Sequence, residues 1–385
     1  MSKFMEDDQD VNDEIQNFIK VWFYAILSLV YCYYVVSKLI PKGVLRLIFL
    51  LPVFYLFTVL PLSLNSLHLG VTSVFFLTWV GNFKLFLSAF NLGPLCAPCA
   101  VAHPPDRVCS SSSSSTDPSK SILLFLCLHC LPIRLKPNTS TTLPKTKECY
   151  PYATIGLQVL ILSGLIRIYD YREVLHPNVI LVFYYLHIYI GAEIALAIGG
   201  ALGGIILGQE LEPPFDKPYL SSSLQEFWGR RWNLMVTGIL RSTVYDPVCR
   251  FFTPVAGKVW AQLLGVFLAF VVSGVVHEAV FYYLTRAHPT WEVTWFFVLH
   301  GMCTIIEVVI KKWLNTSRSS KWVLNRWVSR IMTVGFVIVT GIWLFTPQLI
   351  RNGVDTKVLH EYRIFGEFVT KKFHKFLHYV NHQLN

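Results

Sequence analysis

One apolar stretch decides the fold, and it reads Val255-Ala-Gly-Lys-Val-Trp-Ala-Gln-Leu-Leu-Gly-Val-Phe-Leu-Ala-Phe-Val-Val-Ser-Gly-Val-Val-His-Glu-Ala-Val-Phe-Tyr-Tyr-Leu284. A helix that crosses a bilayer needs about 20 largely apolar residues, and this stretch is longer than that. Its acidic and basic residues are Lys258, near the start, and the neighbours His277 and Glu278, near the end. The stretch therefore predicts a membrane-spanning helix that carries two ionisable groups at membrane depth.

Seven further stretches have a similar apolar composition, and together they predict an all-α, polytopic bundle of about eight transmembrane helices, with seven to nine as the range. They cover residues 18–37, 44–62, 67–83, 152–168, 179–207, 293–310 and 331–350. We expect the chain to divide into five regions. These are an acidic tail at 1–17, three spans at 18–83, a polar loop at 84–151 with a serine-rich segment and a short apolar interfacial stretch, a membrane core at 152–350 that includes a cytosolic amphipathic segment at 208–254, and a basic tail at 351–385.

The composition of the 385 residues agrees with a membrane protein, since 54% are hydrophobic and only 15% are charged. A soluble domain usually carries about 25% charged residues. The formal net charge is +10, and the basic residues lie between apolar runs. This distribution favours anionic lipid or an anionic cosubstrate as the partner and argues against nucleic acid.

The basic clusters also predict the orientation. They lie at 38–46, 84–147, 230–250 and 311–330, which fall on one side of an eight-span bundle. Loops rich in Lys and Arg face the cytosol, so we expect the sequons at Asn138 and Asn315 to stay unglycosylated. The endoplasmic reticulum is the expected membrane. Two Cys-x-x-Cys pairs, at Cys96 and Cys127, are interpreted as free thiols, because the second lies in an apolar run and not in a metal knuckle.

His277 is the first candidate for chemistry. Ionisable groups at membrane depth are costly and usually face a cavity or the bundle interior. A neutral imidazole there suits a general base, and Ser273, one turn earlier, is placed to orient the ring. Glu278 points about 100° away around the helix, so it is not expected to pair with His277. The alternative is a packed histidine that bonds a backbone carbonyl between helices.

A second segment decides between these interpretations, and it reads Phe227-Trp-Gly-Arg-Arg-Trp-Asn233. Ser223 and Glu226 fit a capping box, which predicts a helix from Leu224. That helix would carry Leu224, Trp228, Trp232 and Met235 on an apolar face, and Glu226, Arg230 and Asn233 on another. An amphipathic helix of this kind can also serve only to anchor the chain at the membrane surface.

The two segments together, with Glu212-Pro-Pro-Phe-Asp-Lys-Pro-Tyr219 before them, resemble the membrane-bound O-acyltransferase (MBOAT) superfamily. The resemblance is strongest over 208–310 and is to the plant wax synthase branch, the long-chain-alcohol O-fatty-acyltransferases. It implies that His277 is the catalytic base and Asn233 its polar partner. Related sterol and diacylglycerol acyltransferases carry Phe-Tyr-x-Asp-Trp-Trp-Asn. Here Gly229, Arg230 and Arg231 replace the middle of that pattern without an Asp.

The predicted reaction is transfer of a fatty acyl group from acyl-CoA to a long-chain alcohol. Its predicted substrate-binding residues are Arg230 and Arg231 for the anionic CoA, and Phe227, Trp228 and Trp232 for the apolar chains. Acyl-CoA serves as cosubstrate, and no metal or other cofactor is expected. Two alternatives stay open: a sterol O-acyltransferase on the same scaffold, and a non-enzymatic multi-span lipid carrier.

Overall fold

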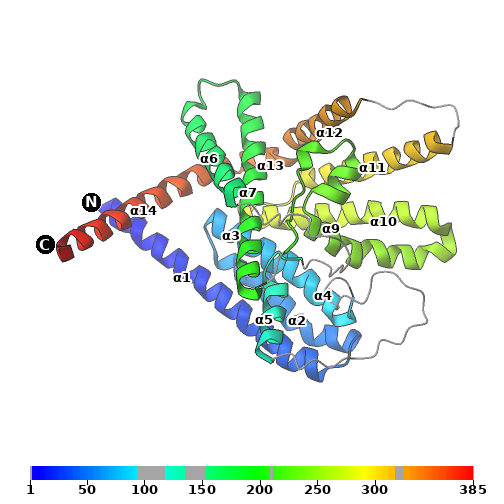
Figure 1. Cartoon of the computed structure of the whole chain (residues 1–385), viewed down its shortest axis with the longest axis horizontal. Helices are drawn as coiled ribbons and strands as arrows, with labels where there is room; N and C mark the ends of the chain where they lie inside the picture. The colour runs from blue at the N-terminus through cyan, green and yellow to red at the C-terminus, as the bar shows by residue number, and fades with distance from the viewer. Residues whose placement is uncertain (1, 93–117, 135–151, 209–210, 317–324, 385) are drawn as a thin grey trace, which may run out of the picture.

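The computed structural model describes residues 2–92, 118–134, 152–208, 211–316 and 325–384, and this part of the chain is helical without strands (Figure 1). The α-helices are α1 (Ser2–Tyr31), α2 (Val44–Val59), α3 (Leu67–Ser73), α4 (Asn82–Phe90), α5 (Pro118–Cys130), α6 (Tyr152–Ile168), α7 (Pro177–Leu207), α8 (Leu224–Glu226), α9 (Leu234–Leu240), α10 (Asp246–Thr285), α11 (Glu292–Thr316), α12 (Arg326–Thr340), α13 (Pro347–Arg351) and α14 (Val354–Leu384). Two pairs are joined without a break by π-helical turns: α3 to α4 through Val74–Gly81, and α9 to α10 through Arg241–Tyr245. Phe227–Arg231 and Gly341–Phe345 are also π-helical, but the extended Trp232 follows the first and a bend at Thr346 follows the second.

Seven helical segments in the described residues are long and apolar enough to cross a membrane, which confirms the predicted all-α polytopic bundle. They are Asp10–Ser37, Val44–Ser63, Leu67–Phe90, Pro177–Leu207, Leu234–Thr285, Glu292–Leu314 and Arg326–Arg351. The stretch expected at 152–168 is the helix α6, which has 17 residues and pairs with α7. All eight predicted stretches are therefore helical, and α6 is the one that falls short of the length of a span.

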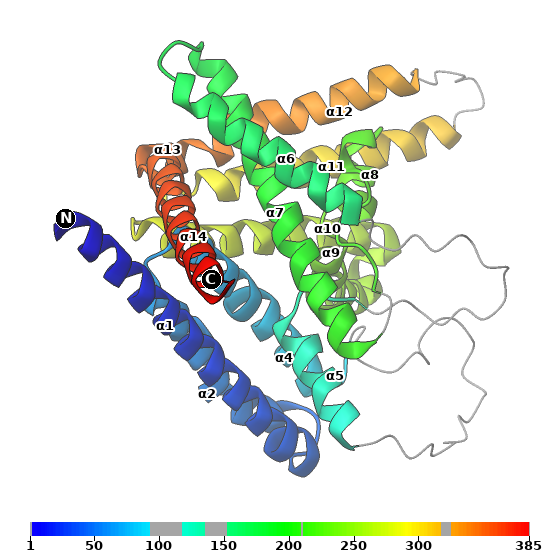
Figure 2. The same ribbon diagram turned by 60° about the vertical axis from the view of Figure 1, so that its left-hand side comes forward.

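The N-terminal helices form the first half of the core. Figure 2 shows α1 and α2 side by side, and they meet through Val21, Leu29, Val53 and Phe57, each at most 4% exposed. Between this pair and the helices α10, α11 and α12 runs the segment Leu67–Phe90, which is the most deeply buried of the seven. This segment links the N-terminal half of the bundle to the half that carries His277.

The region expected as a polar loop from residue 84 begins later in the structure, because α4 continues to Phe90. Lys84 is buried at 4% exposure, and its Nζ donates to the carbonyl oxygens of Leu128 at 2.6 Å and Leu131 at 2.9 Å. These carbonyls lie at the C-terminal end of α5, where a helix leaves carbonyls unsatisfied and favours a cation. The lysine thus fixes the short apolar helix α5 against the bundle, and Cys127 and Cys130 are free and buried within it.

The membrane helix predicted at 255–284 is one arm of a helical hairpin, and the other arm comes from the end of the segment 208–254 that the sequence predicts to be cytosolic. Gly257 has a non-helical backbone with φ 78° and ψ 159°, which reverses the chain inside α10. Gly265 then packs directly on Tyr245, and a Cβ at Gly265 would lie 2.9 Å from the Tyr245 ring. The residues from Leu234 to the turn therefore run back along the membrane helix, because glycines at the turn and at the crossing allow the two arms to approach closely.

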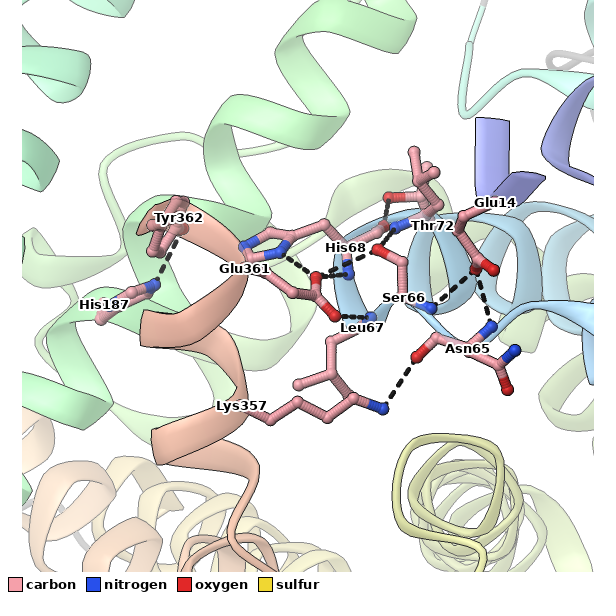
Figure 3. Close-up of polar contacts among 11 residues, drawn as sticks. Glu14, Asn65, Ser66, Leu67, His68, Thr72, His187, Lys357, Glu361 and Tyr362 are labelled. Carbon is pink, nitrogen blue, oxygen red and sulfur yellow. Dashed lines mark hydrogen bonds and ion pairs between the residues drawn. The ribbon is translucent and has the colours of Figure 1, made fainter. Parts of the chain in front are cut away.

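The expected basic tail at 351–385 is mainly the helix α14, which is attached to the bundle by polar contacts (Figure 3). The Glu361 carboxylate accepts hydrogen bonds from the N–H groups of Leu67 at 2.5 Å and His68 at 3.2 Å, and from the Ser66 hydroxyl at 3.0 Å. It also accepts from Nδ1 of the His68 ring at 2.7 Å, while Lys357 donates to the carbonyl of Asn65. We call this set, Asn65–His68 with Lys357 and Glu361, the C-terminal clamp.

The clamp lowers the pKa of Glu361. Burial acts first and raises this pKa, but the hydrogen bonds from the His68 ring and from the N–H groups of Leu67 and His68 outweigh it. The carboxylate also lies at the N-terminus of α3, where the helix dipole favours a negative charge. The orientation of the bundle in the membrane stays a prediction. The serine run, Cys96 and Asn138 lie outside the described residues, and Asn315 lies in the last turn of α11.

Candidate active site

His277 lies on α10, and its ring is oriented by the backbone. Nδ1 donates to the carbonyl oxygen of Ser273 at 2.7 Å. A carbonyl can only accept, so Nδ1 carries the hydrogen and the neutral ring keeps its lone pair on Nε2. The sequence placed the orienting group at the correct residue, but the backbone of Ser273 provides it. No hydrogen bond to Nε2 occurs among the described residues.

Three aromatic rings enclose the imidazole. The ring centroids lie 4.3 Å from Phe297, 5.0 Å from Trp79 and 5.9 Å from Phe345. Glu278 turns away, as predicted, and its carboxyl group contacts Thr294 instead. The imidazole of His277 is therefore held among aromatic rings, in an apolar environment.

A small cavity of about 50 Å³ opens beside this ring. Besides His277, its wall is aromatic except for one aliphatic side chain. The structure thus brings together His277 with the three aromatic residues that the sequence singled out. The wall consists of Tyr185, Ile188, Tyr189, Phe227, Trp228, Trp232, His277, Phe296, Phe297 and Phe345.

The segment before the hairpin is not the single amphipathic helix that the sequence predicts. The helix begins at Leu224 with Ser223 as its cap, as predicted, since the Ser223 hydroxyl accepts from the Glu226 N–H at 3.1 Å. It then widens into a π-helical turn and ends at Arg231. Trp232 is extended, and Asn233 adopts a left-handed backbone with φ 38°.

The physical reason for this break is local capping. Asparagine tolerates the left-handed conformation better than most residues, and its side chain readily caps a helix. The Asn233 Oδ1 accepts from the Val236 N–H at 3.2 Å and starts α9. The predicted shared face for Arg230 and Asn233 is therefore wrong. The break also stacks Trp232 on Phe227, with ring centroids 5.3 Å apart, and so forms part of the cavity wall.

Asn233 itself is not among the residues that line the cavity. The residues that follow it approach the surroundings of His277 through Trp79. Met235 and Val236, which follow it on α9, pack on Trp79, and the ring of Trp79 meets that of His277. Asn233 and His277 are therefore on neighbouring elements, with the amide Nδ2 group of Asn233 left as a donor.

The two arginines differ sharply. Arg231 is 16% exposed, and its guanidinium binds the Glu226 carboxylate at 2.7 Å and the Asp216 carbonyl at 3.0 Å. Burial tends to raise the pKa of Glu226, but hydrogen bonds from Ser222 and Arg231 lower it to about 2. Arg230 is exposed and forms no ion pair within the described part of the chain. Arg230 is thus the arginine with donors left for an anion.

Sequence reasoning missed His300, which is fully buried and bonds the indole of Trp228. A signal was present, because His300 is an ionisable residue within the apolar stretch 293–310. It also missed Tyr185, Tyr189, Phe296, Phe297 and Phe345. Aromatic residues in apolar runs give no sequence signal for a cavity, because they occur equally in lipid-facing and core positions.

The fold and the site together define a class: a polytopic membrane protein with a histidine beside an aromatic cavity. Comparison with known sequences makes the class specific. The sequence model of the membrane bound O-acyl transferase family matches residues 211–299, which include Asn233 and His277. The chain is 42% identical to the long-chain-alcohol O-fatty-acyltransferase of Simmondsia chinensis, and the match covers 94% of this chain and 98% of the relative.

Two relatives from Arabidopsis thaliana show the same extent of similarity. Probable long-chain-alcohol O-fatty-acyltransferase 3 is 44% identical over 94% of this chain and 98% of its own length. Acyl-CoA–sterol O-acyltransferase 1 is 40% identical over 94% of this chain and 99% of its own length. The chain therefore belongs to the membrane-bound O-acyltransferase family, as the motif resemblance implied.

Proposed function

We propose that this protein transfers a fatty acyl group from acyl-CoA to the hydroxyl of a long-chain alcohol and so forms a wax ester, in the membrane of the endoplasmic reticulum. The observation that carries the proposal is the state of His277. Its Nδ1 is committed to the Ser273 carbonyl, and its Nε2 lone pair is left beside an aromatic cavity. A general base needs this arrangement, because an alcohol is too weak an acid to attack without one.

The reaction balances with this chain's own groups. His277 Nε2 takes the proton of the alcohol hydroxyl as its oxygen attacks the thioester carbonyl. The C–O bond forms, the C–S bond breaks, and the CoA thiolate leaves and recovers a proton from the imidazolium. In this proposal Asn233 Nδ2 has the role of donor to the oxygen that gains negative charge, as in an oxyanion hole. Because Asn233 lies outside the cavity wall, this role requires its amide to reach the reacting oxygen when substrate is bound. Neither a metal nor a cofactor beyond the acyl-CoA cosubstrate takes part in the proposed reaction.

The chemistry of the cavity wall fits apolar substrate chains. Phe227, Trp228 and Trp232 line it and contact one another, and none of them places a charge against the cavity. Fatty chains gain free energy by leaving water for such a surface, at roughly 25 cal/mol per Å². Arg230 is the proposed ligand of a CoA phosphate, whereas Arg231 is already engaged by Glu226 and Asp216. Arg231 therefore acts by holding the segment in place.

A sterol acceptor is the second candidate function. A relative named as an acyl-CoA–sterol O-acyltransferase matches this chain nearly as well as the relatives named for long-chain alcohols. Acceptor selection depends on the shape of an apolar cavity, and one wall residue can decide it. A non-enzymatic carrier is not favoured, because the chain belongs to an acyltransferase family.

The experiment is expression in microsomes that lack wax esters, with labelled acyl-CoA and a panel of fatty alcohols, sterols and diacylglycerol. We expect labelled wax ester as the main product. Sterol ester as the main product would replace the proposed acceptor, and no ester with any acceptor would contradict the proposal. A chelator such as EDTA should leave the rate unchanged, since no metal takes part.

The matched control is His129. Its Nδ1 bonds the carbonyl of Phe125, four residues earlier, as Nδ1 of His277 bonds Ser273. Its Nε2, however, is sealed in the protein interior without a partner. The two histidines therefore share the orienting hydrogen bond and differ in access to the cavity. Replacing each by alanine in the same microsomes compares a cavity-facing imidazole with a sealed one.

A further inference from the structure

A second buried histidine lies behind the cavity wall. His300, on α11, has no exposed surface, and both of its ring nitrogens are hydrogen-bonded. Nδ1 accepts from the indole Nε1–H of Trp228 at 3.1 Å, and Nε2 lies 2.9 Å from the Thr340 hydroxyl. His300 does not line the cavity, and it contacts neither His277 nor the proposed substrate position directly.

The chemistry of the partners fixes one direction for these hydrogen bonds. An indole N–H can only donate, so His300 Nδ1 must be the acceptor and Nε2 must carry the hydrogen. That hydrogen points to the oxygen of Thr340, whose own hydroxyl donates to the Phe336 carbonyl at 2.7 Å. The relay Trp228–His300–Thr340 therefore links the motif segment 227–233 to α11 and α12. One tautomer of His300 satisfies both of its hydrogen bonds, and the histidine ring has no contact with solvent.

Trp228 lies where this relay meets the substrate space. Its ring is in the cavity wall, and ring centroids 4.9 to 6.2 Å away belong to Phe227, Trp232, Phe270, Phe296 and Phe297. Phe297 in turn packs on His277 at 4.3 Å. A change in the orientation of the Trp228 indole therefore changes the shape of the cavity next to the base.

We infer that His300 is a positioning residue that fixes the indole of Trp228 and thereby sets which acyl chains fit beside His277. The inference rests on the proposed function, since it names what the cavity selects. Packing alone does not fix an indole, because the ring can turn about two side-chain bonds and still bury its apolar surface. The single buried acceptor on His300 selects one orientation, because any other leaves the indole N–H unsatisfied.

The test is the preference for acyl-CoA chain length. The kcat/KM of the purified protein is measured with a series of saturated acyl-CoAs and one long-chain alcohol. His300→Phe keeps a ring of similar size but offers no acceptor, and we expect it to flatten the preference by roughly tenfold, the scale on which pocket contacts separate homologous chains. His300→Gln keeps an acceptor and should recover most of the wild-type preference.

A double-mutant cycle shows whether His300 acts through Trp228. We expect Trp228→Phe to flatten the preference as well, and the double variant with His300→Phe to lose no more than the single ones. Additive effects would overturn the inference, because the two residues would then act separately. Thr340→Val, which leaves the Trp228 contact intact, should shift the preference in the same direction by less, and it carries the test if His300→Phe does not accumulate.

His129→Phe is the control for loss of a buried histidine, and it should leave the chain-length preference as in the wild type. A wild-type chain-length preference in a folded, active His300→Phe variant would overturn the inference and leave the proposed function intact. Absence of wax ester from the wild type would instead contradict the proposed function. The same assay therefore distinguishes the two failures: the His300→Phe variant tests the inference, and the wild type tests the proposed function.

Discussion

The cavity beside His277 and the C-terminal clamp around Glu361 treat a half-buried polar group in opposite ways. In the clamp, the carboxylate accepts from two backbone N–H groups, a hydroxyl and an imidazole. In the cavity, His277 uses one nitrogen and leaves the other without a hydrogen bond from the described residues. A fully satisfied group holds elements together, whereas a group with unused hydrogen-bonding capacity at a cavity can act on a ligand.

The same comparison separates three histidines by the hydrogen bonds of their ring nitrogens. His187 is bonded through both nitrogens, to Tyr169 and to Tyr362 of α14, so it supports the clamp side of the bundle. His300 is also bonded through both and supports the cavity wall. His277 alone of these three combines a free nitrogen with a position in the wall of the cavity. Counting hydrogen bonds therefore separates the proposed base from the structural histidines, which residue type does not.

The largest expected effect is that of His277→Ala. Loss of a general base typically costs about 100- to 10,000-fold in rate, so ester formation should fall by that factor while the protein still inserts into the membrane. The measurement is the initial rate of ester formation in microsomes, normalised to the amount of inserted protein. His129→Ala should keep a rate near that of the wild type. Equal losses in both variants would mean that His277 only packs.

A second prediction separates the two roles of Asn233. Asn233→Asp keeps the oxygen that caps α9 but loses the Nδ2 donor, so we expect kcat to fall by about 100-fold, the scale of one lost oxyanion donor. The thermal unfolding temperature should change little, because the cap is retained. Asn233→Ala should lower both kcat and the unfolding temperature, since loss of an N-cap costs about 1 kcal/mol. A wild-type kcat for Asn233→Asp would leave Asn233 with the capping role only.

The third prediction concerns the two arginines. If Arg230 binds a CoA phosphate, Arg230→Gln should raise the apparent KM for acyl-CoA by roughly ten- to a hundredfold, as expected from a charge-assisted bond of about 1.5–3 kcal/mol. The KM for the alcohol should stay constant. High salt should mimic the substitution in the wild type and have less effect in the variant.

Arg231→Gln is the contrasting variant. It leaves Glu226 without its cation, so we expect a lower unfolding temperature and similar changes with both substrates. Parallel changes of both KM values in Arg230→Gln would mean that Arg230 only anchors the segment to anionic lipid.

The smallest effect on catalysis is expected in the clamp. Glu361→Gln removes the charge that accepts from Leu67 and His68, so it should lower the unfolding temperature and leave kcat near the wild-type value. The folded-state pKa of Glu361 is lowered, so its contribution to stability is present above the unfolded pKa and is lost as the pH falls through the folded value. Thermal unfolding in detergent at neutral and acidic pH measures this.

The control for the clamp is Glu367→Gln, because Glu367 lies on the same helix and is exposed. We expect its unfolding temperature to match that of the wild type at each pH. A loss of kcat in Glu361→Gln at a temperature where the protein is folded would contradict the separation of clamp and cavity. It would show that the segment Leu67–Phe90 transmits the state of the clamp to Trp79 and His277.

The sequence by itself determined the class of fold and singled out His277 as the candidate base. Bilayer thickness sets a minimum length for an apolar helix, so the composition of each stretch was sufficient to find the membrane helices. The same reasoning identified His277. An ionisable side chain at membrane depth costs free energy, so an imidazole within an apolar stretch usually serves a function. The start of α8 at Leu224 was predicted for a local reason, since a cap involves residues three positions apart.

Only the tertiary structure decided how these parts meet. The hairpin at Gly257, the break at Asn233 and the cavity wall depend on which helices pack together. His300 binds Trp228 from another helix, and Glu361 caps a helix whose first residue, Leu67, lies 294 positions away in the chain. Such contacts carry no local pattern, because any buried acceptor satisfies an indole and any carboxylate caps a helix. Which one does so is settled by the packing of the whole bundle.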